Sequence, residues 1–101
     1  MADGYRLLEE AQADLDDIAA FGAEFYSVDR VLAYDEELHS AFERLVEFPE
    51  LGKLVPERSD TMRALPVEQH IVFYRPVPAP ILIVRVMHQR ADWSNILSEG
   101  Q

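Results

Sequence analysis

The chain has 101 residues, of which 49% are hydrophobic, and it contains no cysteine. A chain of this length is expected to form one domain, over residues 1–101, around one core. The absence of cysteine excludes disulfide scaffolds, thiolate zinc sites and cysteine nucleophiles. The sequence shows no leader of the secretory kind, in which a basic segment precedes an apolar one. No apolar run approaches the roughly 20 residues that cross a bilayer. A cytoplasmic protein without membrane contact is therefore expected.

The formal net charge is -10, from 19 acidic and 9 basic residues. Nonspecific binding to nucleic acid depends on Lys and Arg that release counterions from the phosphate backbone, so this charge argues against it. Residues 1–57 carry a net charge of -11 and residues 58–101 a net charge of +1. The simplest interpretation of the acidic half is a solvated helix surface. A basic surface that meets a partner is expected only in the second half.

A short apolar and aromatic run, Tyr5–Leu8, predicts an edge strand. From Glu9 the apolar residues recur at alternating steps of four and three, which is the pattern of an amphipathic helix. The apolar positions of this helix are Ala11, Leu15, Ile18, Gly22 and Phe25. Acidic residues crowd its first turns, where they complement the positive end of the helix dipole.

A second helix is predicted after a break at Tyr26 and Ser27. Ser27 is a suitable N-cap because its hydroxyl can accept from backbone N–H groups that lack a partner in the first turn. The apolar positions of the second helix are Val31, Tyr34, Leu38, Ala41, Leu45 and Phe48. Pro49 and Gly52 close this helix. Two antiparallel helices with apolar stripes require a further layer that covers them.

That layer is predicted to consist of three strands, which are rich in β-branched and aromatic residues: Met62–Val67, His70–Arg75 and Ile81–His88. The link at residues 76–80 holds three prolines, which lack backbone donors, so it is expected to be an exposed hairpin loop. A short helical turn, Asp92–Leu97, is expected at the end, with Trp93 and Ile96 as its anchors. The prediction is an α+β fold with the order β-α-α-β-β-β, a helical hairpin packed on an antiparallel sheet.

The strand at Ile81–His88 is apolar on both sides, which is typical of a strand inside a sheet. Simple alternation assigns its residues to two faces. One face is expected to hold Ile81, Ile83 and Met87, and the other Leu82, Val84 and Val86.

Several segments together carry a family resemblance. They are Tyr5–Leu8, Ala13–Ile18, Ala41–Leu45, Phe48–Gly52, Arg63–Pro66, Val72–Arg75 and Ile83–Asp92. In this order and spacing they resemble the ParE family of the RelE/ParE toxin superfamily over nearly the whole chain, and the last segment is the most specific. The resemblance implies the toxic half of a type II toxin-antitoxin pair, with no cofactor and no metal.

The same resemblance implies a hetero-oligomer with a small ParD-like antitoxin, whose flexible segment folds along the helices and the sheet edge. The candidate antitoxin-binding residues are Phe21, Phe25, Tyr26 and Tyr34. The alternative is that these aromatic side chains belong to the core. With Phe42 included, that alternative is preferred for most of these aromatic residues, whereas Phe21 and Tyr26 fall at the margins of the apolar stripe and are suited to face a partner.

The resemblance to ParE toxins implies that the protein binds DNA gyrase and traps its cleavage complex. This activity requires a recognition surface and no bond-breaking residue. The candidate target-binding residues are Arg63, Arg85, His88 and Arg90. The structural alternative is that Arg63 and Arg85 pair with carboxylates such as Asp92 or Glu68.

Two other functions stay open. A RelE-type endoribonuclease would cleave ribosome-bound messenger RNA, with Arg63 and Arg85 stabilising the phosphate and His88 transferring a proton. His88 is equally suited to end the strand with a hydrogen bond to Asp92. Lys53 is the only lysine, and no Tyr follows the last strand. The third possibility is an inactive family member that only binds antitoxin, since a net charge of -10 departs from the family's usual composition.

Overall fold

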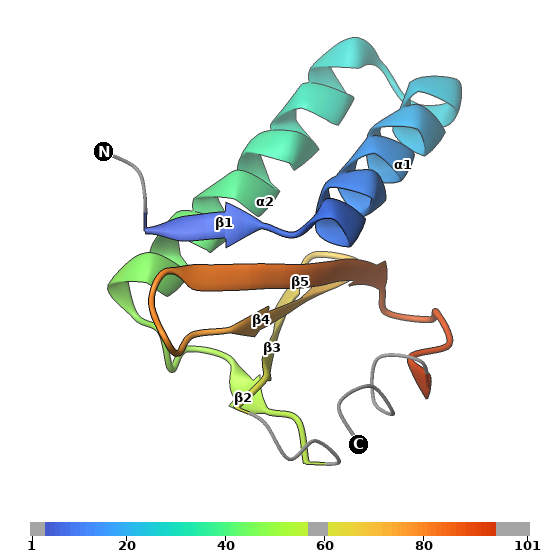
Figure 1. The fold of residues 1–101 in the computed structure, drawn as a ribbon. Coiled ribbons are helices and arrows are strands. Elements are labelled where there is room, and N and C mark those ends of the chain that lie inside the picture. The colour runs from blue at the N-terminus through green and yellow to red at the C-terminus, as the bar shows by residue number, and fades with distance from the viewer. Residues whose placement is uncertain (1–3, 57–60, 95–101) are drawn as a thin grey trace.

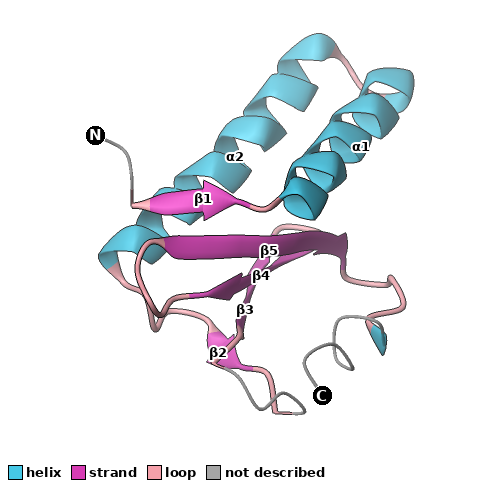
Figure 2. Ribbon diagram, in the orientation of Figure 1, coloured by secondary structure: helices cyan, strands magenta, loops and turns pink. Residues whose placement is uncertain are grey.

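The computed structural model describes residues 4–56 and 61–94. Two helices lie over one face of a five-stranded sheet (Figures 1 and 2). The elements in chain order are β1 (Tyr5–Leu7), α1 (Glu9–Phe25), α2 (Val28–Glu47), β2 (Lys53–Leu54), β3 (Arg63–Val67), β4 (His70–Arg75) and β5 (Ile81–His88). The predicted α+β fold, with a helical hairpin on a sheet, is confirmed.

The strand order in the sheet is β1-β5-β4-β3-β2. The expected antiparallel pairing holds for β3, β4 and β5, and β2 also pairs antiparallel with β3, whereas β1 runs parallel to β5. Parallel neighbours need a long crossover, and here the helical hairpin and three further strands separate β1 from β5 along the chain. The short strand β2 was not predicted, because its two residues are both exposed and too few to show a pattern. β5 lies inside the sheet, as expected, between β1 and β4.

The N-cap sets the start of the second helix. The Ser27 hydroxyl oxygen accepts from the Arg30 backbone N–H at 3.2 Å, which confirms the predicted cap. The helix therefore begins at Val28, ahead of the first apolar position at Val31. The first helix begins at Glu9, as predicted, with Glu9 and Glu10 in its first turn.

The main core fills the space between the helices and the sheet. Its buried residues are Ala11, Leu15, Leu38, Ala41, Phe42, Leu45, Val67, Val72, Tyr74, Ile81, Ile83 and Val86. Two large side chains of the predicted apolar stripes stay outside it in contact with solvent, since Phe25 is 62% exposed and Phe48 is 57% exposed. Phe25 ends α1 at the tip of the hairpin, which projects beyond the sheet (Figure 1). The prediction that Phe25 is a core residue is wrong, because none of the described elements covers the hairpin at that point.

A second, smaller core lies on the other face of the sheet. Its buried residues are Val55, Met62, Ile71, Phe73 and Val84. Trp93 covers it, with its ring 5.8 Å from the ring of Phe73 at 75°, so the prediction that Trp93 anchors the C-terminal segment is confirmed. Ile96 and the rest of the predicted turn beyond Ser94 lie outside the described residues. The link between β4 and β5 is exposed at residues 77–79, as expected, although Pro76 is buried.

An irregular pairing in β5 changes the predicted faces. Phe73 opposes Arg85 and Tyr74 opposes Ile83, so Val84 is an extra residue on β5. A β-bulge of this kind reverses the alternation of all residues beyond it. Val86 therefore packs in the main core and Met87 against the second core, and their predicted assignment to faces is wrong.

Buried hydrogen bonds fix the turn that follows α2. The Tyr74 hydroxyl donates to the Pro49 carbonyl oxygen at 2.8 Å and accepts from the Gly52 backbone N–H at 2.8 Å. A Cβ atom added to Gly52 would lie 2.8 Å from the Ala64 carbonyl oxygen, so only glycine fits this approach. Tyr74 is fully buried, and burial raises the pKa of its hydroxyl, which keeps it protonated. The Pro-x-x-Gly segment is thus held against the sheet.

The Tyr74→Phe substitution is expected to lower the free energy of unfolding by about 1–3 kcal/mol, because it removes both hydrogen bonds and leaves buried polar groups unpaired. Urea unfolding followed by circular dichroism measures this loss. Tyr26→Phe is the matched control, since the Tyr26 side chain is 46% exposed and is expected to change stability by less than about 0.5 kcal/mol. Equal effects of the two substitutions would contradict a structural role for the Tyr74 hydroxyl.

Candidate functional site

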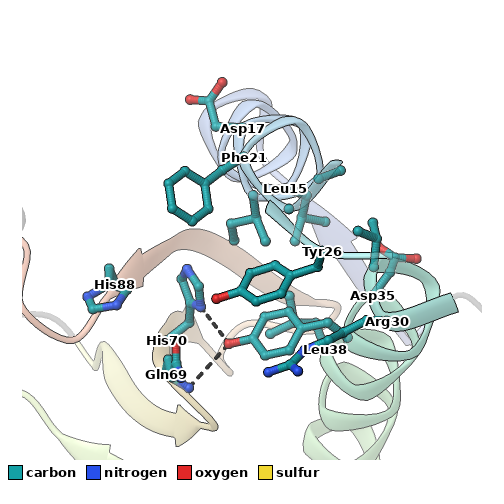
Figure 3. A pocket seen from close by; sticks show the side chains of 15 residues that line it. Leu15, Asp17, Phe21, Tyr26, Arg30, Asp35, Leu38, Gln69, His70 and His88 are labelled. Carbon is teal, nitrogen blue, oxygen red and sulfur yellow. Dashed lines mark hydrogen bonds between the residues drawn. The ribbon is translucent and has the colours of Figure 1, made fainter. Parts of the chain in front are cut away.

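A cleft opens where the helical hairpin leaves the sheet. Its volume is about 380 Å³. Its walls are formed by residues of α1 and α2 and its floor by the start of β4 and the end of β5 (Figure 3). The lining residues are Leu15, Asp17, Ile18, Ala19, Phe21, Gly22, Tyr26, Arg30, Val31, Tyr34, Asp35, Leu38, Gln69, His70 and His88. The helices supply mostly apolar side chains together with Asp17, Arg30 and Asp35, and the sheet side supplies Gln69, His70 and His88.

A hydrogen-bonded group forms the floor of the cleft. The Tyr34 hydroxyl lies 2.6 Å from His70 Nδ1 and also accepts from the Gln69 backbone N–H at 3.2 Å. Since its oxygen already accepts, the Tyr34 hydroxyl is assigned as donor to Nδ1, which places the proton of a neutral His70 on Nε2. The His70 and His88 rings pack edge to face, with centroids 5.3 Å apart. This arrangement ties α2 to the sheet.

Protonation of His70 is disfavoured in the folded protein. Burial lowers the pKa of His70 from its ordinary value of 6.5, the neighbouring His88 lowers it further, and Asp14 acts in the opposite direction. Burial also raises the pKa of Tyr34, so its hydroxyl keeps its proton. Both shifts favour the neutral Tyr34–His70 hydrogen bond.

Acidification is expected to destabilise the fold through His70. Because the folded pKa lies below 6.5, the unfolded chain binds the proton first as the pH falls. The stability that neutral His70 contributes is therefore complete above pH 6.5 and is lost as the pH falls from 6.5 toward the folded pKa. Melting temperatures between about pH 7.5 and 5 measure this slope. His70→Gln is expected to flatten it, and an unchanged slope in that variant would show that other groups cause the loss.

The hairpin tip above the cleft is apolar and exposed. Phe21 and Phe25 are 61% and 62% exposed, and the centroids of their rings lie 4.7 Å apart. Tyr26 is 46% exposed, and the Arg30 guanidinium lies 4.5 Å from the centre of its ring. The structure thus brings all four candidate antitoxin-binding residues to one region. Phe21 and Tyr26 (Figure 3) line the cleft together with Tyr34, and the Phe25 ring packs against that of Phe21.

The Arg85 guanidinium binds a carboxylate of α1. Its Nε and Nη2 atoms donate to the two Asp14 oxygens at 2.8 and 2.9 Å, and the Val86 backbone N–H donates to the same carboxylate at 2.8 Å. β1 ends opposite Ile83. Beyond Ile83 the Asp14 side chain, in place of a strand, pairs with the backbone at the edge of β5. The ion pair that was considered for Arg85 exists, but its partner is Asp14.

The other candidate target-binding residues are spread over the sheet. The Arg63 Nη1 atom donates to the carbonyl oxygens of Gly52 at 2.6 Å and Glu50 at 3.3 Å, not to a carboxylate. Arg63 opposes Tyr74 and His88 opposes His70, so these two residues lie toward opposite ends of β4. Arg90 is exposed in the turn after β5.

The hydrogen bond to Asp92 that was considered as one alternative for His88 does not form. His88 Nδ1 accepts instead from the Arg90 backbone N–H at 3.1 Å, because the turn after β5 places that donor two residues away. The Asp92 carboxylate accepts from the backbone N–H and hydroxyl of Ser94. These hydrogen bonds lower the pKa of Asp92.

Sequence reasoning missed several residues of the cleft. His70 and Gln69 lie at the hairpin that joins β3 and β4, and nothing in their spacing relates them to Tyr34, which precedes His70 by 36 residues. Across residues 4–56 and 61–94, no group of three side chains is arranged to hold a metal ion. Within the same ranges, neither helix is long and apolar enough to cross a membrane.

Comparison with known proteins identifies two sequence relatives, a solved chain with the same fold and a matching family model. Toxin ParE1 of Caulobacter vibrioides is 35% identical over 85 residues, which cover 84% of this chain and 88% of that toxin. Toxin ParE1 of Mycobacterium tuberculosis is 34% identical over 93 residues, which cover 91% of this chain and 95% of that toxin. A solved chain of the chromosomal ParDE TA system from P. aeruginosa shares the fold, with a TM-score of 0.70 over 83% of this chain and 92% of that chain at 21% identity. The family model of the ParE toxin of the type II toxin-antitoxin system parDE matches residues 5–93, and the chain therefore belongs to the ParE toxin family.

Proposed function

We propose that this ParE family member arrests growth by binding DNA gyrase without catalysing a reaction, and that a ParD-like antitoxin neutralises it by binding the cleft and the hairpin tip. Family membership supports the toxin role. The observation that carries the antitoxin surface is the exposed aromatic cluster beside an apolar cleft. Both proposed partners would place its action in the cytoplasm.

The antitoxin surface follows from what the hairpin leaves uncovered. Contiguous exposed apolar side chains are uncommon on soluble monomers and typically mark a partner-binding surface. Here Phe21, Phe25 and Tyr26 gather beside the cleft, and Tyr34 lies inside it. A flexible segment that becomes ordered on binding can cover such a surface over a large area. The shared fold with a chain of a ParDE system supports a partner of the ParD kind.

The positions of the basic residues favour target binding over RNA cleavage. An endoribonuclease requires cationic groups and a proton-transfer group that converge on one phosphate. Arg85 is held by Asp14, Arg63 is held by the carbonyl oxygens of the turn after α2, and His88 lies toward the other end of β4. We therefore assign Arg63, Arg85, His88 and Arg90 to target recognition.

Growth and gyrase assays test this function. Expression of the chain alone is expected to arrest growth, and the purified protein is expected to inhibit gyrase supercoiling while translated messages stay intact. Messages cut at ribosomal A-site codons would support the RelE-type alternative instead. Normal growth at confirmed expression would support an inactive family member that only binds antitoxin. Coexpression with the short neighbouring reading frame, where that frame encodes a ParD-like protein, is expected to restore growth.

Alanine substitutions of the candidate target-binding residues test the proposed gyrase-binding surface in the same supercoiling assay. Arg90→Ala changes an exposed side chain and is expected to reduce supercoiling inhibition without changing the melting temperature. His88→Ala is also expected to reduce inhibition, but it removes the ring contact with His70, so it is assayed at a temperature where the variant is folded. Arg44→Ala, which removes an exposed arginine of α2, is the matched control and is expected to leave inhibition intact. Full inhibition by the doubly substituted His88→Ala, Arg90→Ala protein would remove these two residues from the proposed surface.

A further inference from the structure

The two helices carry the whole net charge of the chain. α1 and α2 together hold twelve acidic residues and two basic residues, Arg30 and Arg44, for a net charge of -10. Eleven of the twelve carboxylates are on exposed residues, and the other, Asp14, is bound to Arg85. The hairpin is therefore strongly acidic, and the cleft and the exposed Phe21, Phe25 and Tyr26 side chains offer apolar surface on it.

Two acidic residues border the cleft, and their carboxylates point outward from it (Figure 3). Asp17 on α1 and Asp35 on α2 both line it (Figure 3). Asp17 makes no hydrogen bond or ion pair with any other described residue, and Asp35 has only the weak His39 contact at 3.7 Å. Arg30, the one cation in the lining, lies over the Tyr26 ring. An occupant of the cleft therefore meets mostly apolar walls, bordered by Asp17, Asp35 and Arg30, on two helices whose net charge is -10.

We propose that the segment that fills this cleft is amphipathic and net basic, with apolar side chains that enter between Phe21, Tyr26 and Tyr34 and with Lys or Arg side chains that meet the Asp17 and Asp35 carboxylates. This inference rests on the proposed function in one respect, namely that the segment belongs to the antitoxin. Opposite charges across an interface accelerate association and exclude partners of the wrong sign. An apolar stripe on a helix is the usual occupant of an apolar groove between helices.

Other occupants fit the charge less well. A second copy of this chain would bring another net charge of -10 to the same surface, and its most basic half, residues 58–101, carries only +1. An acidic segment or a nucleic acid would meet repulsion from the helices. A basic amphipathic segment fits both the apolar walls and the acidic helices.

Three labelled synthetic peptides of about 16 residues test the proposal by fluorescence anisotropy. The first carries a Leu and Trp stripe at helical spacing with Lys on its flanks, the second has Glu in place of each Lys, and the third keeps Lys but has Ala in the stripe. The first peptide is expected to bind the full-length protein at least about 10-fold more tightly than either of the others at low ionic strength. Its advantage over the Glu peptide is expected to shrink in about 0.5 M salt, because salt screens exposed charges.

Charge-matched variants locate the binding. The double substitution Asp17→Asn, Asp35→Asn is expected to weaken binding of the Lys peptide about 3-fold or more. Glu43→Gln with Glu47→Gln removes the same charge from the far end of α2 and is expected to have a smaller effect. Phe21→Ala is expected to weaken the same peptide, whereas Leu54→Ala, an exposed apolar residue of β2, is expected to leave it unchanged.

Several outcomes would overturn the proposal. These are equal or tighter binding of the Glu peptide, equal binding of the Ala-stripe peptide, no binding of any peptide, equal effects of the two charge-matched pairs, or a dimer in analytical ultracentrifugation that Phe21→Ala dissolves. The proposed function is tested separately by growth. An antitoxin that restores growth through an acidic docking segment would refute this inference and leave the proposed function intact. Binding of the Lys peptide as expected by a chain that never arrests growth would support this inference and refute the proposed function.

Discussion

Replacing Leu38 with alanine is expected to lower the free energy of unfolding by about 2–5 kcal/mol, which is the usual range for a leucine buried in a well-packed core. The Leu38 side chain is 1% exposed, lies in the main core and also contributes to the inner wall of the cleft. Its loss leaves a cavity between α2 and the sheet that the rigid strands cannot fill. Urea unfolding with a two-state fit measures the change, provided that the slope with denaturant stays constant.

The control for this substitution lies on the same helix. Leu32 is 60% exposed near the hairpin tip, so Leu32→Ala removes the same atoms from a site in contact with water. It is expected to change the free energy of unfolding by less than about 0.5 kcal/mol. A loss that small for Leu38→Ala would show that α2 does not rest on the sheet through this face. A large loss for Leu32→Ala would show that the tip is covered in solution.

The sequence was sufficient to predict the helices and the three long strands, because their signals are local. Apolar steps of three and four residues marked α1 and α2, and the Ser27 hydroxyl marked the start of α2. The two-residue strand β2 has no such period, so it could not be recognised. The parallel pairing of β1 depends on where β5 lies after the helices and strands that separate the two in the chain, and no local sequence pattern indicates that position.

The bulge at Val84 shows why faces are harder to predict than strands. Strict alternation was correct for Ile81 and Ile83 and wrong for Val86 and Met87, since one extra residue reverses every face beyond it. A bulge places an unpaired residue in a strand, and its position depends on contacts with other elements. Here the Asp14 carboxylate accepts from the Val86 N–H just past the bulge.

The candidate site was predictable only in part. The aromatic residues at the margins of the helix stripes were recognisable from spacing, and Phe21 and Tyr26 do line the cleft. Phe25 was placed in the core because periodicity does not show where the sheet stops covering the hairpin. His70 meets Tyr34 only through the packing of α2 on β4, which is a tertiary contact without a sequence signature.

The partner of Arg85 was beyond sequence reasoning for the same reason, because Asp14 and Arg85 lie 71 residues apart. Their side chains are 13% and 26% exposed, so solvent screens the pair only partly. Asp14→Ala is expected to lower the free energy of unfolding by about 2–4 kcal/mol, toward the lower part of the range for breaking a buried pair. Arg85→Ala is expected to cost less, because the Val86 N–H keeps its Asp14 acceptor in that variant.

A double-mutant cycle separates the structural role of Arg85 from target recognition. The Asp14→Ala, Arg85→Ala protein is expected to be more stable than the sum of the single losses predicts, with a coupling of about 1–3 kcal/mol. Arg85→Lys is expected to recover little of the loss, because an ammonium group cannot make the two-point contact of a guanidinium. If Arg85 also contacts gyrase, the doubly substituted protein will inhibit supercoiling less than Asp14→Ala alone at a temperature where both are folded. Unchanged stability in Arg85→Ala with lost inhibition would instead mean that the Asp14 contact contributes nothing and that recognition alone requires the guanidinium.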